Sequence, residues 1–427
     1  MSAAASATFA GGLKEFPLTE IFGQGDHGYD TFRIPALVYN NGVFLAFCEA
    51  RKNSFRDWGE MELVLRRGVL EEKGVEWGDI QVIASIPNKR TMNPVPIVDK
   101  LNDSIVLVFN TFPPDVTETD LLKAGLYNQT LYVMKSLDNG VTWSEPKDIT
   151  DMTLGSVEKP WAIYAPGPGH GIQLSSGRLL VPGNYAVKDP VEPGVWPQIK
   201  TAVMEFFDIL HGSLVTSNVL YSDDGGCTWH VGGSLPAAMA PESDKIIQCN
   251  EAQAIELDDG LVCINSRTLG ADAPRAQAYS TDGGLSFGKT RIIEELIEPG
   301  YTGGWMPSTK NFGGCQGSVL GFPAPDGVPN GLPKTWAIFS NPADRESRIN
   351  LSVRLSMDHC KTWSSPWSLC PGPSAYSDLT YFETEGENGS AVKRFACLYE
   401  CGTTDFPYEK IVFQMFTLES LLEGTKH

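Results

Sequence analysis

The octapeptide SLDNGVTW at residues 136–143 recurs as SDDGGCTW at 222–229, STDGGLSF at 280–287 and SMDHCKTW at 356–363. The shared pattern is S-x-D-x-G-x-[TS]-[WF], and the fourth copy departs from it by carrying Cys360 in place of glycine. Aspartate accepts hydrogen bonds from nearby backbone N–H groups, and glycine permits the positive φ of a tight turn. An aromatic side chain then anchors the turn in a core. Each copy therefore predicts a hairpin clip between two strands.

Strand-like runs flank these clips, and successive copies start 86, 58 and 76 residues apart. The 43 glycines and 29 prolines agree with many turns. A hairpin unit repeated along an all-β chain predicts a β-propeller, with a sandwich of repeated hairpins as the alternative. We expect residues 1–427 to form a single domain of this kind.

One segment interrupts the β pattern. Residues 197–211 read PQIKTAVMEFFDILH, and their apolar side chains follow a helical spacing. The sequence predicts a helix inserted on a long loop. It either packs against the core or acts as a lid or a subunit contact.

Composition excludes several classes of protein. The chain has 33 Lys and Arg against 52 Asp and Glu, a net charge of −19, so a nucleic-acid-binding surface and a polybasic membrane anchor are not expected. No run approaches the roughly 20 apolar residues that span a bilayer, and no apolar run near the N-terminus resembles a secretory signal. We expect a cytoplasmic protein, with peripheral membrane association left open.

Cysteine and histidine usage gives no metal or cofactor motif. The nine cysteines include no C-x-x-C pair, and the six histidines lack ligand spacing. We expect free, mostly buried thiols in a reducing compartment, and no metal or cofactor.

Near the start of the chain, residues 32–35 read FRIP and precede the strand-like run ALV. This stretch resembles the arginine motif of the sialidase family, and the four octapeptides resemble that family's Asp boxes. Later stretches agree with the family pattern: AYSDL at 375–379, CLYE at 397–400 and IVFQMFTL at 411–418. The resemblance covers nearly the whole chain and is greatest to the animal cytosolic and membrane-associated sialidases.

The resemblance implies a six-bladed β-propeller that acts as a retaining exo-α-sialidase. Its partners would be sialylated glycolipids, glycoproteins or oligosaccharides. The substrate carries a carboxylate on its anomeric carbon, and a guanidinium fork matches a carboxylate in two places. The matching arginines are Arg33, Arg267 and Arg348, with Arg345 as the competitor for the third role. Glu400 resembles the residue that orients Arg33 by an ion pair.

The catalytic residues implied by the resemblance are Tyr376 as nucleophile, Glu251 as its base and Asp57 as general acid. A carboxylate nucleophile would be repelled by the carboxylate of the substrate, whereas a phenol is neutral. Because a phenol has a pKa near 10, it requires an adjacent base. The spacing between Asp57 and Glu62 has one residue more than the family pattern, so Glu60 is the alternative acid.

Further substrate contacts follow from the same resemblance. Arg51 would lie near the 4-hydroxyl of the sugar, and Glu118 would contact its amide or hydroxyl groups. The animal enzymes carry two tyrosines in a P-x-Y-x-Y stretch that contacts the glycerol and N-acyl side of the sugar. Here Asn184 and Ala186 stand at those positions and Tyr185 is out of phase. We therefore expect an altered preference among N-acetyl, N-glycolyl and deaminated sialic acids.

Two other functions remain open at this point. A catalytically silent sialic-acid-binding propeller would need the arginines but not Tyr376 and Glu251. A trans-sialidase would keep the site and choose its acceptor through aromatic residues at the rim, for which Trp58, Trp196 and Trp305 are candidates. The sequence carries no prediction of an oligomeric state.

Overall fold

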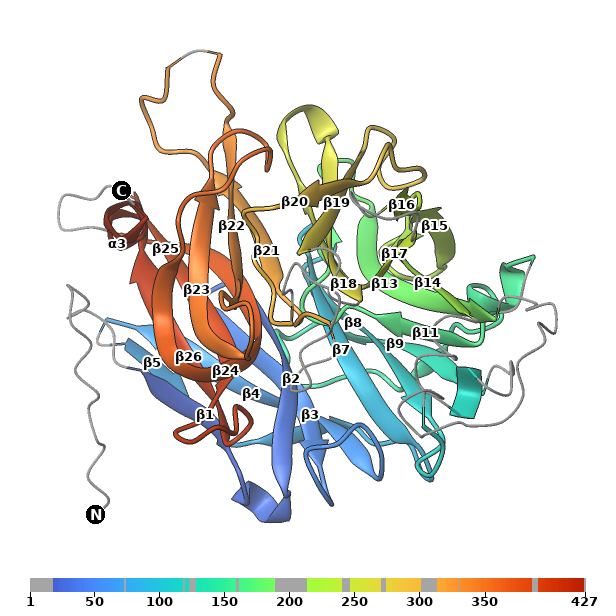
Figure 1. Cartoon of the computed structure of the whole chain (residues 1–427). Coiled ribbons are helices and arrows are strands. Elements are labelled where there is room, and N and C mark those ends of the chain that lie inside the picture. The colour runs from blue at the N-terminus through green and yellow to red at the C-terminus, as the bar shows by residue number, and fades with distance from the viewer. Residues whose placement is uncertain are drawn as a thin grey trace, which may run out of the picture.

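The computed structural model describes residues 18–72, 74–117, 120–122, 128–158, 161–188, 213–239, 246–269, 274–300, 313–329, 331–385 and 391–425. The regular elements formed by these residues are nearly all β-strands, which confirms the predicted all-β class. Figure 1 shows the sheets arranged around a common centre, from the blue N-terminal strands to the red C-terminal ones. The helix predicted over 197–211, Glu118, Trp196 and Trp305 lie outside the described residues.

The first two blades share one nine-stranded sheet. The first blade contains β2 (Thr31–Asn40), β3 (Val43–Arg51), β4 (Met61–Glu71), β5 (Gly74–Trp77) and β6 (Gln81–Ala84). The second contains β7 (Arg90–Asp99), β8 (Ser104–Phe112), β9 (Thr130–Ser136) and β10 (Lys147–Asp148). A parallel bridge between Met61 and Arg90 joins the two groups, so the sheet divides into two antiparallel blades.

The next two blades are separate five-stranded sheets. The third blade contains β11 (Ile163–Pro166), β12 (Ile172–Gln173), β13 (Leu179–Lys188), β14 (Ser213–Ser222) and β15 (His230–Ser234). The fourth contains β16 (Ala238–Met239), β17 (Ile246–Glu256), β18 (Val262–Leu269), β19 (Arg275–Ser280) and β20 (Arg291–Ile293).

The last two blades share the 19-residue strand β24 (Trp367–Glu385). Its first part pairs with β23 (Ile349–Ser356), which continues to β22 (Thr335–Pro342) and β21 (Ser318–Pro323). Its second part pairs with β25 (Ala391–Cys401), followed by β26 (Lys410–Thr417) and β1 (Thr19–Gly23). The N-terminal strand thus completes the C-terminal blade and closes a ring of six blades, as expected from the family resemblance.

Residues 120–122 are helical, and four short helices with complete bounds add to the described elements. They are the 3-10 helices η1 (Asp26–Gly28), η2 (Leu154–Ser156) and η3 (Asp258–Gly260), and the α-helix α3 (Leu418–Gly424). Within the described ranges, no helix is long and apolar enough to cross a membrane.

The four octapeptides form the predicted hairpin clips. In the first, Asp138 accepts hydrogen bonds from Ser136 Oγ (2.8 Å) and from the backbone N–H of Thr142 (2.8 Å). The same pattern recurs around Asp224, Asp282 and Asp358. Each clip places two consecutive residues at left-handed φ. The fourth clip does so with His359 (φ 62°) and Cys360 (φ 61°), so the missing glycine does not change the turn.

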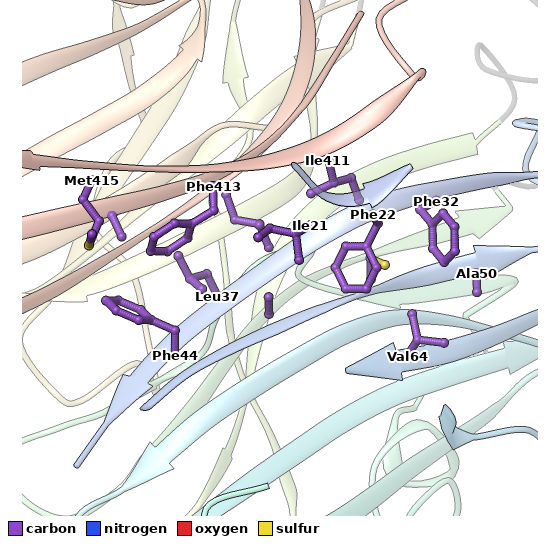
Figure 2. Packing of buried hydrophobic residues seen from close by; sticks show 14 of the residues in the cluster. Ile21, Phe22, Phe32, Leu37, Phe44, Ala50, Val64, Ile411, Phe413 and Met415 are labelled. Atoms are coloured by element: carbon purple, nitrogen blue, oxygen red, sulfur yellow. The ribbon is translucent and has the colours of Figure 1, made fainter. Parts of the chain in front are cut away.

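Apolar side chains fill the space between neighbouring blades. Figure 2 shows the cluster between the last and first blades, where Ile21 and Phe22 of β1 pack among residues of β2, β3, β4 and β26. The rings of Phe22 and Phe32 stack at 5.3 Å. Burying a side chain such as Phe22 contributes about 1.5–3 kcal/mol. This packing fixes the start of β2, where Arg33 lies.

A buried carboxylate ties the inner strands together. Asp378 on β24 accepts hydrogen bonds from the backbone of Leu37 on β2 (2.8 Å), from Gln253 Nε2 on β17 (2.9 Å) and from Ser318 Oγ on β21 (2.8 Å). His170 Nδ1 lies 2.8 Å from the same carboxylate. A buried charge is tolerated when it is hydrogen-bonded in this way. His170 therefore belongs to the group of side chains that holds the inner strands together.

All nine cysteines are free and seven of them are buried, as predicted.

Candidate active site

Strand bulges bring the predicted catalytic residues together. In β2, β17 and β24 the pairing register shifts so that two residues on one strand oppose a single residue on its neighbour. The shifts begin at Arg33, enclose Glu251 and enclose Tyr376, respectively. A bulge bends its strand and redirects a side chain. In β2 the bulge also holds Ile34 at φ 63°, a strained value for a β-branched residue.

Tyr376, Glu251 and Arg267 form one hydrogen-bonded group. The Tyr376 hydroxyl donates to Glu251 Oε1, and Arg267 Nη1 lies 2.6 Å from Glu251 Oε2 and 3.2 Å from the Tyr376 hydroxyl. Burial and the Glu251 carboxylate raise the pKa of Tyr376 well above 10, against the lowering effect of Arg267 and Arg348. The phenol is thus neutral in the free protein, with an acceptor for its proton already in contact.

Glu400 holds Arg33 against the same group. Arg33 donates from Nε to Glu400 Oε1 (3.0 Å) and from Nη2 to Oε2 (3.3 Å). The fully buried Glu400 carboxylate also accepts the backbone N–H groups of Ile34 (2.9 Å) and Tyr376 (3.1 Å). Burial lowers the pKa of Arg33, but Glu400 together with Tyr408, Asp57 and Tyr376 outweighs this effect and keeps the guanidinium charged. The carboxylate therefore ties both Arg33 and Tyr376 to β25.

Arg348, rather than Arg345, lies beside the tyrosine. The Arg348 guanidinium carbon is 5.5 Å from the centre of the Tyr376 ring, whereas the side chain of Arg345 is exposed. Arg348 donates from Nη1 to the Tyr408 hydroxyl (2.8 Å) and from Nη2 to the Gly314 carbonyl (3.2 Å). Three arginines thus surround Tyr376.

Asp57, rather than Glu60, faces the arginines. Asp57 Oδ1 lies 2.8 Å from Arg51 Nη1 and 3.7 Å from Arg33 Nη1, and its side chain is 60% exposed. Desolvation opposes ionisation, but Arg51 and Arg33 outweigh it and lower the pKa of Asp57 to about 2. Glu60 instead pairs with Lys52 at 3.2 Å and is exposed.

Buried residues that sequence reasoning missed support the Asp57 loop. Glu49 accepts from Arg51 Nη2 (2.6 Å) and orients it. Arg90 donates to the backbone carbonyl of Asp57, and from Nη2 to that of Val116 (2.8 Å). Arg90 thereby joins the loop after β3 to the loop after β8. No local sequence pattern indicates this role of Arg90, because the two carbonyls lie 33 and 26 residues away from it in the sequence.

Gly313 and Gly314, which the sequence analysis did not single out, lie between two of the arginines. The carbonyl of Gly313 accepts from Arg267 Nε (2.9 Å), and the carbonyl of Gly314 accepts from Arg348. Gly314 has φ 75°, and a Cβ there would stand 2.5 Å from Glu298 Oε2, so only glycine fits. The Gly-Gly pair is a visible sign of a special turn, but its role as an arginine support is not.

Strand β13 carries Asn184, Tyr185 and Ala186, where the sequence differs from the P-x-Y-x-Y pattern. These three residues lie on two faces of the strand. Asn184 is buried and donates to the Ala165 carbonyl (3.3 Å). Ala186 packs in the apolar cluster that contains Met92. The structure does not place Tyr185 with them: its ring stacks on Trp161 at 4.0 Å, between the second and third blades. Of the rim tryptophans, Trp58 is described and is exposed.

No group of three or more metal-ligating His, Cys, Asp and Glu side chains occurs in the described part of the chain.

Comparison with known proteins identifies the family. A family model described as a BNR repeat-like domain matches residues 42–387. Sialidase-3 from Homo sapiens is 33% identical over 438 residues, covering 94% of this chain and 92% of that protein. Sialidase-2 from Mus musculus is 34% identical over 410 residues, covering 93% and 94%. The solved structure of the Hadza microbial sialidase Hz136 has the same fold, with a TM-score of 0.70 at 22% identity, over 95% of this chain and 69% of that one. The chain therefore belongs to the sialidase family and is a glycoside hydrolase.

Proposed function

We propose that this sialidase is an exo-α-sialidase that hydrolyses terminal sialic acids from glycoconjugates with retention of configuration, through a covalent bond to Tyr376. The observation that carries the proposal is the contact of the Tyr376 hydroxyl with both Glu251 and Arg267 inside a ring of arginines. A silent sialic-acid-binding protein would have no use for a buried tyrosine hydrogen-bonded to a carboxylate.

Substrate binding rests on the three arginines around Tyr376. The guanidinium carbons of Arg33 and Arg348 lie 5.2 and 5.5 Å from the centre of its ring, and Arg267 contacts its hydroxyl. Together they receive the carboxylate of the sugar through charge-assisted hydrogen bonds. Arg51, beside Asp57, serves the 4-hydroxyl. The anomeric carbon then stands next to the tyrosine hydroxyl.

In the first step Tyr376 transfers its proton to Glu251, and the phenolate oxygen bonds to the anomeric carbon. Arg267, in contact with both groups, stabilises the negative charge that develops on the phenolate. The glycosidic bond breaks, and the leaving oxygen takes a proton from Asp57. In the second step Asp57 takes a proton from water, the water oxygen bonds to the anomeric carbon, and Tyr376 leaves and recovers its proton from Glu251.

Asp57 must be protonated to act as the acid, although its pKa in the free protein is about 2. The substrate carboxylate supplies the change. When it pairs with Arg33, it weakens the attraction of that arginine for Asp57, and the pKa of Asp57 rises.

The Asn184 and Ala186 positions set the preference for the sugar's side groups. Two tyrosine rings of the animal pattern are replaced here by a small amide and a methyl group, which makes this side of the site less aromatic. We therefore expect the preference among N-acetyl, N-glycolyl and deaminated sialic acids to differ from that of enzymes with the two tyrosines.

The test is hydrolysis of aryl α-glycosides of N-acetylneuraminic acid and of its deaminated analogue by the wild type, Tyr376→Phe and the control Tyr279→Phe. The Tyr279 hydroxyl donates to the carbonyl of His359 within the fourth clip, so the control removes a hydroxyl away from the site. We expect a loss of at least about 10³-fold in kcat for Tyr376→Phe, since the covalent route is closed. NMR of the first-formed anomer checks retention. Binding of sialic acid without turnover by the wild type would contradict the proposal, and a sialylated sugar as product would indicate transfer.

A further inference from the structure

The three arginines around Tyr376 differ in the partners that hold them. Arg33 is paired with Glu400, and Arg267 is paired with Glu251. Within the described part of the chain, no carboxylate pairs with Arg348. Its side-chain partner is the hydroxyl of Tyr408, at 2.8 Å from Nη1, and its buried Nε has no partner among the described atoms.

Tyr408 contacts two of the three arginines at once. It lies between β25 and β26, eight residues after Glu400. While its hydroxyl accepts from Arg348, its ring lies 4.1 Å from the guanidinium carbon of Arg33. An arginine over an aromatic face at this distance is attracted by the ring quadrupole. One side chain therefore sets the spacing between Arg33 and Arg348.

The same ring also touches the loop that carries Asp57. Phe55 of that loop stacks on Tyr408 with ring centres 5.8 Å apart and planes 16° apart. Phe406 packs edge-on against both rings. The backbone carbonyl of Phe55 in turn accepts from Arg51. Tyr408 is thus held from the side of the Asp57 loop, and its hydroxyl is aimed at Arg348.

A phenol and a carboxylate have different effects on an arginine that must bind an anion. A carboxylate orients the guanidinium but neutralises its charge, whereas a phenol hydroxyl orients it and leaves the charge intact. From these contacts, and resting on the proposed function, we infer that Tyr408 is a positioning residue. It holds Arg348 ready for the substrate carboxylate and keeps that arginine the least neutralised of the three.

The test compares Tyr408→Phe with the wild type and with Tyr279→Phe, the same substitution beside the fourth clip. Phenylalanine keeps the ring against Arg33 and Phe55 and removes only the hydroxyl. A hydrogen bond from a charged group corresponds to about a 10-fold or larger change in binding. We expect KM for the aryl sialoside to rise about 10-fold and kcat to change by less than about 3-fold, because the carboxylate is bound alike in the ground and transition states. A merely structural role would lower the melting temperature and would not separate KM from kcat.

Calorimetry with N-acetylneuraminic acid gives a second readout that does not need turnover. Its dissociation constant should weaken about 10-fold in Tyr408→Phe and stay unchanged in Tyr279→Phe. If the wild type hydrolyses the substrate and Tyr408→Phe keeps the wild-type KM and dissociation constant, the role of Tyr408 is overturned and the proposed function stands. If the wild type binds the sugar without hydrolysis and Tyr408→Phe weakens that binding, the proposed function fails and the role of Tyr408 stands. If the wild type neither binds nor hydrolyses, both are overturned.

Discussion

The Asp-box hairpins and the candidate active site around Tyr376 use the same chemistry over different distances along the chain. In the hairpins, the donors to Asp138 lie two to four residues away. In the site, Arg33 and Glu400 are 367 residues apart, and Tyr376 and Glu251 are 125 residues apart. Both regions surround carboxylates with donors. The hairpins complete themselves locally, whereas the site is complete only when β1 has joined β26 and the ring is closed.

The comparison extends to the ionisation of these groups. Hydrogen bonds from Thr142 lower the pKa of Asp138 to about 2. In Asp224 and Asp282 desolvation is the largest single effect and raises the pKa, but the hairpin donors together outweigh it and bring the pKa to about 2. A pKa lowered from 3.8 contributes stability above about pH 4 that is lost as the pH falls through 2. In the site, by contrast, burial raises the pKa of Tyr376, so its neutral form is favoured.

The largest effect is expected from a change that breaks a distant contact. Glu400→Gln keeps the size of the side chain but leaves Arg33 without its ion pair. Removing one partner of a buried pair costs about 3–5 kcal/mol of unfolding free energy. We also expect kcat/KM to fall by about 100-fold or more, because Arg33 and the Tyr376 backbone lose a shared acceptor. Denaturant unfolding and steady-state kinetics measure both.

The control for this variant is Glu256→Gln. Glu256 lies on β17 and accepts from Ser175 N–H (2.7 Å) and Oγ (2.7 Å), a distant contact outside the site. We expect about 1 kcal/mol of destabilisation and wild-type kinetics. If the two variants lose the same unfolding free energy and the same kcat/KM, the ion pair between Arg33 and Glu400 matters no more than an ordinary long-range contact.

A smaller effect is expected in the protons exchanged on binding. The pKa of Asp57 is about 2 in the free protein and rises when a sugar carboxylate takes up Arg33. Between the two values the complex binds more protons than the free protein, so binding takes up protons and strengthens as the pH falls. Calorimetry at pH 4–5 in two buffers of different ionisation enthalpy measures the uptake. If Asp57→Asn takes up as many protons on binding as the wild type does, the uptake belongs to another group.

The smallest effect on catalysis is expected from the hairpins. Ser222 is fully buried, and its hydroxyl donates to Asp224 (2.8 Å) and accepts from the Gly226 N–H (2.8 Å). Ser222→Ala should cost about 1–2 kcal/mol of unfolding free energy and leave kcat/KM unchanged at a temperature where the protein is folded. A fall in kcat/KM without unfolding would mean that the hairpins and the site are coupled, and the contrast between them would no longer hold.

Much of the fold was predictable because its strongest features are local. The clips were found from eight consecutive residues each, and the FRIP stretch and the late motifs pointed to the family. The sharing of β24 by two blades was not predictable, since nothing in 19 strand residues marks the change of partner from β23 to β25. Nor was closure by β1, whose partner β26 lies at the other end of the chain.

The sequence points to the candidate site only where its residues coincide with a family motif. Tyr408, Arg90 and the Gly313–Gly314 turn were missed, because each acts on a residue far away in the sequence through a hydrogen bond that leaves no periodic pattern. Their contacts depend on how neighbouring blades are placed, and that placement comes from packing in the cores between blades.

By itself, the sequence determined the hairpin clips, the all-β class and the set of candidate side chains, since turn chemistry needs partners only two to four residues away. Only the tertiary structure decided which candidates meet: Arg348 instead of Arg345, and Asp57 instead of Glu60. The physical reason lies in the strands. Side chains alternate between faces with a period of two, and a bulge of one residue reverses that alternation. The bulges at Arg33, Glu251 and Tyr376 form where the inner strands meet around the buried Asp378, and no local stretch of sequence contains that arrangement.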